Sequence, residues 1–134
     1  MEEFKKKILK IVEQRQLCSY MNDTKWSELR KAVLEEMPFS PPFTIKWVYD
    51  SANPDSLQED VYYLGDWQEA LGHEDHVHGI AIEWMKVRPR YLKHQGKLMP
   101  PEVIDASEQF ENILINHNIP YEVEEGVFCI YGYK

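Results

Sequence analysis

Residues 38–42, PFSPP, separate two hydrophobic periodicities and limit the possible folds more than any other feature of the sequence. Residues 25–37 carry apolar side chains at the spacing of an amphipathic helix. Residues 43–50 alternate apolar and polar side chains, as a strand with one buried face does. The helical positions are Trp26, Leu29, Val33 and Met37, and the strand positions are Phe43, Ile45, Trp47 and Tyr49. Because the prolines cannot continue a helix, the chain must pass here from a helical layer to a sheet.

The remaining patterns predict further helices and strands. Residues 2–19 form an amphipathic pattern, and Asn22, Asp23 and Thr24 supply capping residues for a helix that ends at Pro38. The elements expected after residue 50 are a short strand at 61–63 followed by a loop, a strand within 77–87, an irregular basic connection at 88–101, a helix at 102–116 and a hairpin at 121–133.

The order of these elements predicts an α+β fold. We expect a single domain over residues 1–134, with a mainly antiparallel sheet of about four to five strands. The N-terminal helices and one later helix would pack against this sheet, and we interpret the helix at residues 2–19 as an addition to the core.

The sequence also carries information about the compartment. It has no apolar run of membrane-spanning length, and charged residues interrupt the apolar stretch near the N-terminus, which argues against a signal peptide. The two cysteines, Cys18 and Cys129, form no CxxC motif, as is common in a reducing compartment. We therefore expect a cytoplasmic protein.

Charge is distributed in blocks along the chain, which has a formal net charge of −8. Residues 47–85 contain nine acidic residues and no lysine or arginine. Residues 86–97 contain five basic residues and no acidic one, and residues 98–133 are again acidic. The negative field of such acidic blocks repels nucleic acid and attracts basic proteins. Because an acidic face also serves solubility alone, the pattern leaves both a binding surface and a plain solvated face open.

Residues 71–80, LGHEDHVHGI, gather His73, His76 and His78 beside two acidic residues. In an extended segment His76 and His78 project from the same face, and imidazole and carboxylate groups are common ligands of Zn²⁺. The spacing is not HExxH, however, and both cysteines are distant in the sequence. We expect no bound metal, and the three histidines remain the alternative metal-binding set.

The sequence predicts no catalytic residues and no cofactor. It contains no GxSxG motif and no glycine-rich phosphate loop. Cys18 has no adjacent histidine, and Cys129 alternates with apolar positions of the last hairpin, as a packed thiol does.

The acidic block at residues 47–85 supplies the predicted contact surface for a basic partner. Its carboxylates would steer association, while tyrosine and tryptophan would supply desolvated contact. Trp67 is open to a second interpretation, a loop tryptophan that folds over the core. The predicted partner-binding residues are Asp55, Glu59, Asp60, Tyr62, Asp66, Trp67, Glu69, Glu74 and Asp75.

Four short stretches resemble a family of small bacterial proteins of unknown function that we associate with the immunity proteins of secreted toxins. These stretches are NDTKWSELRKAV, PPFTIKWVYD, IEWMKVRPR and IPYEVEEGVFCIYGYK, which cover about residues 20–134. The resemblance implies a cytoplasmic protein that binds and neutralises a cognate toxin, and it supplies no catalytic residues. It agrees with the charge argument, because toxins that attack nucleic acids present basic clefts that an acidic surface can fill.

The predicted function is therefore that of an immunity protein, an acidic module that neutralises a bacterial toxin, such as a nuclease, by occluding its basic surface. We expect a protein partner, no nucleic acid, no membrane, and a monomer or a homodimer. One alternative is a metal-binding protein or small hydrolase centred on His73, His76 and His78. Another is a regulatory or structural protein that self-associates through the edge of its sheet.

Overall fold

Helices and strands follow one another along the chain as an α+β fold requires. The computed structural model describes residues 2–134 except 56, 69–71, 74–75 and 78, and for 72–73 and 76–77 it describes only the backbone. The elements are α1 (Glu2–Gln14), α2 (Asp23–Glu36), β1 (Phe43–Trp47), β2 (Gly72–His73), β3 (His76–Val77), the 3₁₀ turn η1 (Gly79–Ala81), β4 (Ile82–Val87), β5 (Arg90–Lys93), β6 (Glu102–Asp105), α3 (Ser107–Asn116), β7 (Glu122–Glu124) and β8 (Val127–Tyr131).

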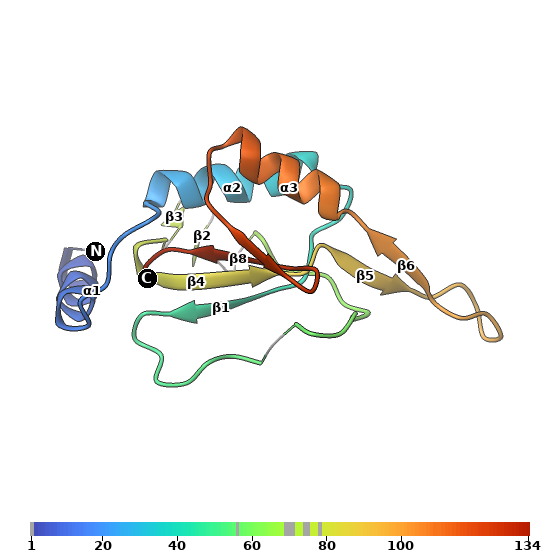
Figure 1. The fold of residues 1–134 in the computed structure, drawn as a ribbon, viewed down its shortest axis with the longest axis horizontal. Coiled ribbons are helices and arrows are strands. Elements are labelled where there is room, and N and C mark those ends of the chain that lie inside the picture. The colour runs from blue at the N-terminus through green and yellow to red at the C-terminus, as the bar shows by residue number, and fades with distance from the viewer. Residues whose placement is uncertain (1, 56, 69–71, 74–75, 78) are drawn as a thin grey trace.

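Four strands form one antiparallel sheet in the order β1–β4–β8–β7, and α2 and α3 lie across one of its faces (Figure 1). In the central pair Met85 is opposite Ile130 and Val87 is opposite Phe128, and all four side chains are buried beneath the helices. The strands β2–β3 and β5–β6 form two further antiparallel pairs. The predicted fold class, a mainly antiparallel sheet with helices packed against it, is confirmed.

Helix α2 begins and ends where the sequence predicts. The side chain of Asn22 accepts a hydrogen bond from the backbone N–H three residues later and so caps the first turn. Trp26, Leu29 and Val33 are buried on one side of the helix, which ends before Pro38. The helical stripe is thus the side that packs against the core.

Aromatic rings fill the centre of the core. The ring centroid of Phe110 in α3 lies 5.3 Å from that of Phe128 and 6.4 Å from that of Trp67. The Trp67 ring is also 5.0 Å from Phe43, and its Nε1 donates a hydrogen bond of 2.8 Å to the carbonyl of Pro41. The edge-on arrangement of these rings suits their quadrupoles, and the indole N–H is satisfied inside the core.

Helix α1 ends at Gln14, so the predicted helix at residues 2–19 was too long. Gln16 takes a left-handed conformation with φ of 56°, which terminates the helix. Beyond it, the backbones of Cys18 and Lys134 exchange two hydrogen bonds, of 3.2 and 3.0 Å. Pairing with the end of the chain therefore replaces the last helical turn.

Helix α1 packs beside one end of the sheet rather than across its face (Figure 1). Ile8 is buried there with Val48, Ala81 and Tyr133. The side chain of Arg15 also donates a hydrogen bond of 3.0 Å to the carbonyl of Val48. These contacts join the helix to the chain that follows β1 and to the C-terminal segment.

The predicted strand at residues 61–63 was wrong. The chain here has no regular secondary structure, although the carbonyl of Val61 accepts a hydrogen bond of 2.7 Å from the N–H of Leu92. Tyr62 and Tyr63 are exposed, so their preference for strands is not reinforced by burial of their rings.

The strand predicted within residues 77–87 is preceded by the turn η1 and begins at Ile82. The N–H of Ile80 donates a hydrogen bond of 2.7 Å to the side chain of Asp23 at the start of α2. Gly79 lies so close to the indole of Trp26 that a Cβ atom at this position would be 2.4 Å from Cδ1 of that ring. The turn is therefore packed directly on α2.

The irregular connection predicted at residues 88–101 was also wrong. Strands β5 and β6 pair to form an arm that projects away from the main sheet (Figure 1). Because residues 102–105 belong to this arm, the helix predicted at 102–116 begins only at Ser107. Its backbone N–H donates a hydrogen bond of 2.8 Å to the side chain of Asp105.

The hairpin predicted at the end of the chain is confirmed as β7 and β8. Its turn consists of Glu125 and Gly126, whose φ angles are 51° and 80°. A two-residue turn of this kind needs left-handed backbone at both positions, and glycine adopts it without strain. In the paired strands Glu122 is opposite Cys129, so their side chains lie on the same face of the sheet.

Candidate functional site

The face of the sheet opposite α2 and α3 carries charged and polar side chains. Cys129 and Tyr131 alternate along β8 with the core residues of that strand. Lys86 of β4 and Glu122 of β7 flank Cys129 on either side, and Glu124 follows two positions after Glu122. Because side chains alternate across a strand, these five share one face, here termed the open face.

A cavity of about 610 Å³ lies on the open face and is here termed the acidic hollow. This volume is large enough for a small molecule or for several side chains of a protein partner. Three glutamates and one lysine are the charged residues among its described lining residues. The lining residues are Leu57, Gln58, Lys86, Glu122, Val123, Glu124, Glu125, Val127, Cys129 and Tyr131.

The environment of the hollow keeps its tyrosine and its thiol neutral. Desolvation, a hydrogen bond with Cys129 and the charges of Glu122 and Glu124 raise the pKa of Tyr131 to about 12. Burial likewise raises the pKa of Cys129. Because a thiol is a much weaker nucleophile than a thiolate, this arrangement favours binding over covalent chemistry.

Lys86 is held on the open face by an aromatic ring. Its Nζ lies 4.8 Å from the ring centroid of Trp84, the next residue along β4 on the same side. A cation over an indole ring is attracted by the negative face of the ring. The one described cation in the lining of the hollow is thus drawn toward Trp84.

The glutamates of β7 and its turn are exposed to solvent. Lys134 approaches Glu122 with Nζ 3.3 Å from Oε1, but both side chains are more than half exposed, so this ion pair contributes little stability. The salt bridges among the described residues include neither Glu124 nor Glu125. The carboxylates of the hollow are therefore accessible to a partner.

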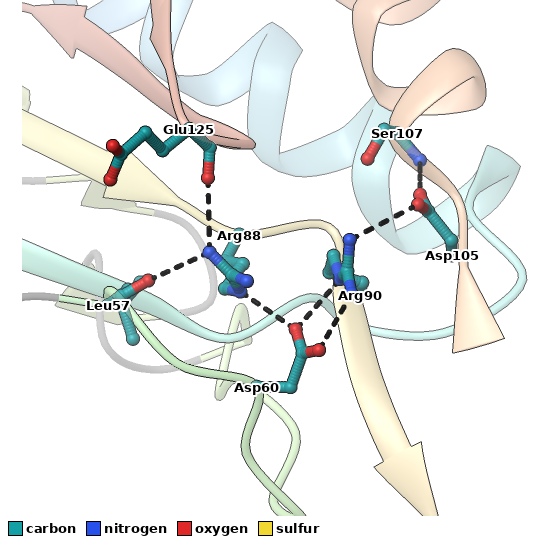
Figure 2. A network of polar contacts seen from close by, with 7 residues as sticks. All are labelled: Leu57, Asp60, Arg88, Arg90, Asp105, Ser107 and Glu125. Carbon is teal, nitrogen blue, oxygen red and sulfur yellow. Dashed lines mark hydrogen bonds and ion pairs between the residues drawn. The ribbon is translucent and has the colours of Figure 1, made fainter. Parts of the chain in front are cut away.

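Arg88, which follows β4, fixes two walls of the hollow (Figure 2). Its Nη1 donates hydrogen bonds of 3.3 Å to the carbonyls of Leu57 and Glu125, both of which line the hollow. Its Nε donates a third, of 2.8 Å, to Oδ1 of Asp60. One largely buried guanidinium thus joins the loop after β1 to the turn between β7 and β8.

Asp60 is shared between two arginines, and the three residues Asp60, Arg88 and Arg90 are here termed the arginine clasp (Figure 2). Arg90 donates to both carboxylate oxygens, from Nε at 2.8 Å and from Nη2 at 2.7 Å. Burial by itself would raise the pKa of Asp60, but the hydrogen bonds and charges of the two arginines outweigh it and lower that pKa. Asp60 is therefore an ionised residue that belongs to the fold.

A second ion-pair cluster lies where β4 meets β1. Glu83 accepts a hydrogen bond of 2.8 Å from Nζ of the buried Lys46, and it also pairs with Arg15. Burial would raise the pKa of Glu83, yet the hydrogen bonds from Arg15 and Lys46 outweigh it and lower that pKa. Because Arg15 follows α1, this cluster ties that helix to the sheet.

Two of the predicted partner-binding residues are engaged inside the fold. Trp67 is only 1% exposed, so its assignment as a contact residue was wrong and the alternative of a tryptophan folded over the core is confirmed. Its indole N–H finds the Pro41 carbonyl as a partner, so burial leaves no donor unsatisfied. Asp60 is held by the arginine clasp, and its assignment to the contact surface stays a prediction.

The other described members of the predicted contact surface are Asp55, Glu59, Tyr62 and Asp66, and their side chains are exposed. The loop that carries Asp55 and Glu59 also supplies Leu57 to the lining of the hollow. The ring of Tyr62 stacks on His94 at the end of β5, with centroids 4.4 Å apart. Part of the predicted acidic surface therefore borders the hollow, while Tyr62 supports the arm.

The histidine segment is described only in part. The backbones of His73 and His76 are paired between β2 and β3. His78, Glu69, Glu74 and Asp75 lie outside the described residues. Within the described part of the chain, no group of three or more His, Cys, Asp or Glu side chains is arranged to hold a metal ion. The alternative metal site at His73, His76 and His78 stays a prediction.

The glutamates of the hollow were missed because the prediction concentrated on residues 47–85, the block without basic residues. The sequence pattern of the last hairpin nevertheless contains them. With the turn at Glu125, strand pairing places Glu122 and Glu124 on the open face, whereas Phe128 points to the other face, toward the core. No local pattern places Lys86 in the hollow, since its position beside Cys129 depends on pairing between strands that are distant in the sequence.

A family model matches residues 8–134, which is nearly the whole chain. The chain belongs to DUF6678. The family is described as one of unknown function. The part shared with DUF6678 includes the second half of α1, the arginine clasp and the whole lining of the acidic hollow. Searches of the curated proteins and of the solved structures found no match. The resemblance to a family of unknown function is confirmed, and its association with toxin immunity stays a prediction.

None of the helices in the described part of this DUF6678 chain is both long enough and apolar enough to cross a membrane.

Proposed function

We propose that this chain is a binding module that receives a basic segment of another protein in its acidic hollow. The observation that carries the proposal is the hollow itself, a cavity of about 610 Å³ with three glutamates and one lysine among its described lining residues. Carboxylates gathered in a concave surface attract basic partners and orient them as they approach. The apolar residues of the lining would supply the desolvated part of the contact.

The place of β7 in the sheet supports the same proposal. This strand is at one end of the sheet order, pairs with β8 and is exposed along its length. An edge strand offers backbone hydrogen-bonding groups to an extended segment of a partner. The acidic side chains of Glu122 and Glu124 would select a basic segment over others.

The arginine clasp would prepare the hollow for binding. Arg88 already holds the carbonyls of Leu57 and Glu125, so two walls of the hollow are positioned before a partner arrives. A surface that is ordered in advance loses less conformational entropy on binding.

The resemblance to immunity proteins suggests a specific biological use. The partner would be a bacterial toxin, and occupation of the hollow by a basic segment would block the toxin's working surface. Asp55 and Glu59, exposed in the adjacent loop, would extend the acidic surface beyond the hollow.

The test is binding to the C-terminal domain of a large secreted protein encoded next to this chain's gene, in a catalytically inactive form. We expect the Kd, measured by calorimetry, to weaken by roughly tenfold or more between about 50 and about 300 mM NaCl. The double reversal Glu122→Lys with Glu124→Lys should weaken binding by at least about tenfold at low salt.

The matched control is the double reversal Glu35→Lys with Glu36→Lys. It changes the net charge equally, but at the end of α2, which covers the opposite face of the sheet. We expect its Kd to stay within about twofold of the original. Equal weakening by both variants would mean that only net charge acts, and no weakening by the variant of the hollow would contradict the proposal. A neighbouring gene of another kind would contradict the immunity role.

A further inference from the structure

The tip of the β5–β6 arm exposes apolar side chains far from the core. Residues 94–101 join the two strands, and within them Leu98 is 98% exposed and Met99 is 57% exposed. Single apolar residues on a surface are common, but two exposed neighbours at the end of a projecting arm form a contact surface that the described residues of the chain leave uncovered (Figure 1).

The base of the arm is fixed to the body of the protein. Arg90, the first residue of β5, belongs to the arginine clasp. The N–H of Leu92 donates a hydrogen bond of 2.7 Å to the carbonyl of Val61, and the ring of His94 stacks on Tyr62. Folding the arm back onto the sheet would break these contacts, so the tip is presented to other molecules.

The charges of the tip are opposite to those of the hollow. Residues 94–101 contain Lys97 and no acidic residue, while Lys93 at the end of β5 lies opposite Glu102 of β6. The hollow contains three glutamates together with apolar lining such as Leu57 and Val127. This single chain thus carries a basic, apolar projection and an acidic, partly apolar cavity.

We propose that the tip of the arm docks into the acidic hollow of a second copy of this chain. Leu98 enters the lining, and Lys97 meets the carboxylates of Glu122 and Glu124. When two copies exchange their tips reciprocally, each tip fills a hollow and the assembly closes as a dimer. Full burial of one leucine side chain strengthens association by roughly 10- to 100-fold.

A second copy fits the tip better than an anionic lipid surface does. The chain has a net charge of −8, so most of its surface is repelled by an anionic membrane. The acidic hollow, by contrast, offers both carboxylates for Lys97 and apolar lining for Leu98.

This inference does not depend on the proposed basic partner, because self-association is measured with the protein alone. Both contacts use the same hollow, however, so a second copy and a basic partner would compete. The two proposals can therefore fail separately. Leu98→Asp should weaken self-association and leave the Kd for the basic partner within about twofold, since Leu98 is not in the hollow.

The first experiment is sedimentation velocity of the full chain from micromolar to near-millimolar concentration. We expect a concentration-dependent shift to a larger species. Leu98→Asp should raise the dissociation constant by at least about tenfold, because a charge cannot enter the apolar lining. Ile115→Asp, a change of the same kind at an exposed position of α3, is the control and should leave the dissociation constant within about twofold.

A charge exchange tests the pairing of tip and hollow directly. Lys93→Glu with Lys97→Glu makes the arm acidic, and Glu122→Lys with Glu124→Lys makes the hollow basic. Each double variant alone should be monomeric, because its arm and hollow repel. An equimolar mixture should associate, since each arm then faces a hollow of opposite charge. The chain with all four changes, whose net charge equals the original, should also self-associate.

Three results would overturn the proposal. The first is a monomeric chain across the whole concentration range. The second is association that Leu98→Asp leaves unchanged or that the charge exchange does not restore in variants with native circular dichroism. The third is flotation of the chain with phosphatidylglycerol vesicles that requires Leu98, which would assign the tip to a lipid surface instead.

Discussion

The two faces of the main sheet use neighbouring residues of the same strands for different purposes. On the face under α2 and α3, Met85 and Ile130 are fully buried and belong to the core. On the open face, their neighbours Lys86 and Tyr131 line a cavity. Alternation along a strand allows one element to stabilise the fold and to present a binding surface at once. Changes to the first face should therefore alter the free energy of unfolding, and changes to the second should alter binding.

The largest expected effect is at Trp67. Trp67→Ala removes a fully buried ring that packs on Phe43 and Phe110, so it should lower the free energy of unfolding by about 3–5 kcal/mol. Urea unfolding followed by circular dichroism measures this change. Tyr63→Ala, an exposed aromatic residue in the same part of the chain, should cost less than about 1 kcal/mol. A similar small loss at Trp67 would return that residue to the candidates for the contact surface.

The next largest effect tests whether the arginine clasp belongs to the fold, although it borders the open face. Asp60→Asn leaves Arg88 and Arg90 without their carboxylate in a largely buried setting, and should lower the free energy of unfolding by about 3 kcal/mol. Asp55→Asn changes an exposed acid of the same loop and should cost less than about 0.5 kcal/mol. Equal stability of the two variants would show that the clasp does not hold the loop.

The pH dependence of the same variant gives an independent check. Because the folded protein lowers the pKa of Asp60, its contribution to stability is complete above the unfolded pKa of about 3.9 and is lost as the pH falls through the lower folded pKa. Glu83 acts in the same direction. Below about pH 4, stability should therefore fall less steeply in Asp60→Asn than in the original chain. Identical acid unfolding profiles would contradict the lowered pKa.

The smallest effect on stability is expected on the open face. Glu122→Lys with Glu124→Lys should change the free energy of unfolding by less than about 1 kcal/mol, because both side chains are exposed. The same variant should alter binding by an order of magnitude, as described above. A large loss of stability, measured by urea unfolding, would show that the two faces do not divide these roles.

Local patterns were sufficient to predict the elements that depend on nearby residues. The cap at Asn22, the strand after Pro42 and the turn at Glu125 and Gly126 were all readable because neighbouring residues determine them. The α+β class followed from the order of these elements.

The errors occurred where distant pairing decided the outcome. Prolines 89, 100 and 101 concealed the alternation of β5, and the residues that pair with it had been assigned to the next helix. Helix α1 ends before the left-handed Gln16, and the residues predicted to continue it instead lead to Cys18, which pairs with Lys134. Such contacts leave no local periodicity in the sequence.

The candidate site was predicted in its charge but not in its position. An acidic surface was expected, and acidic side chains do gather in one cavity, but among its described lining residues they come from β7 and its turn, whereas residues 47–85 supply Leu57 and Gln58. Trp67 was misplaced because the Gly65-Asp66 pair before it indicated a surface turn. Only the fold brings the carbonyl of Pro41 within reach of its indole.

The contact between Gly79 and Trp26 restricts how related chains can vary. A side chain at position 79 would enter the space that the indole occupies, so a larger residue there requires a change at position 26. Across DUF6678, we expect a residue larger than glycine at position 79 only where position 26 holds a side chain smaller than tryptophan. Substitution of both positions in one chain should cost less stability than the two single changes added together, which is the signature of direct coupling.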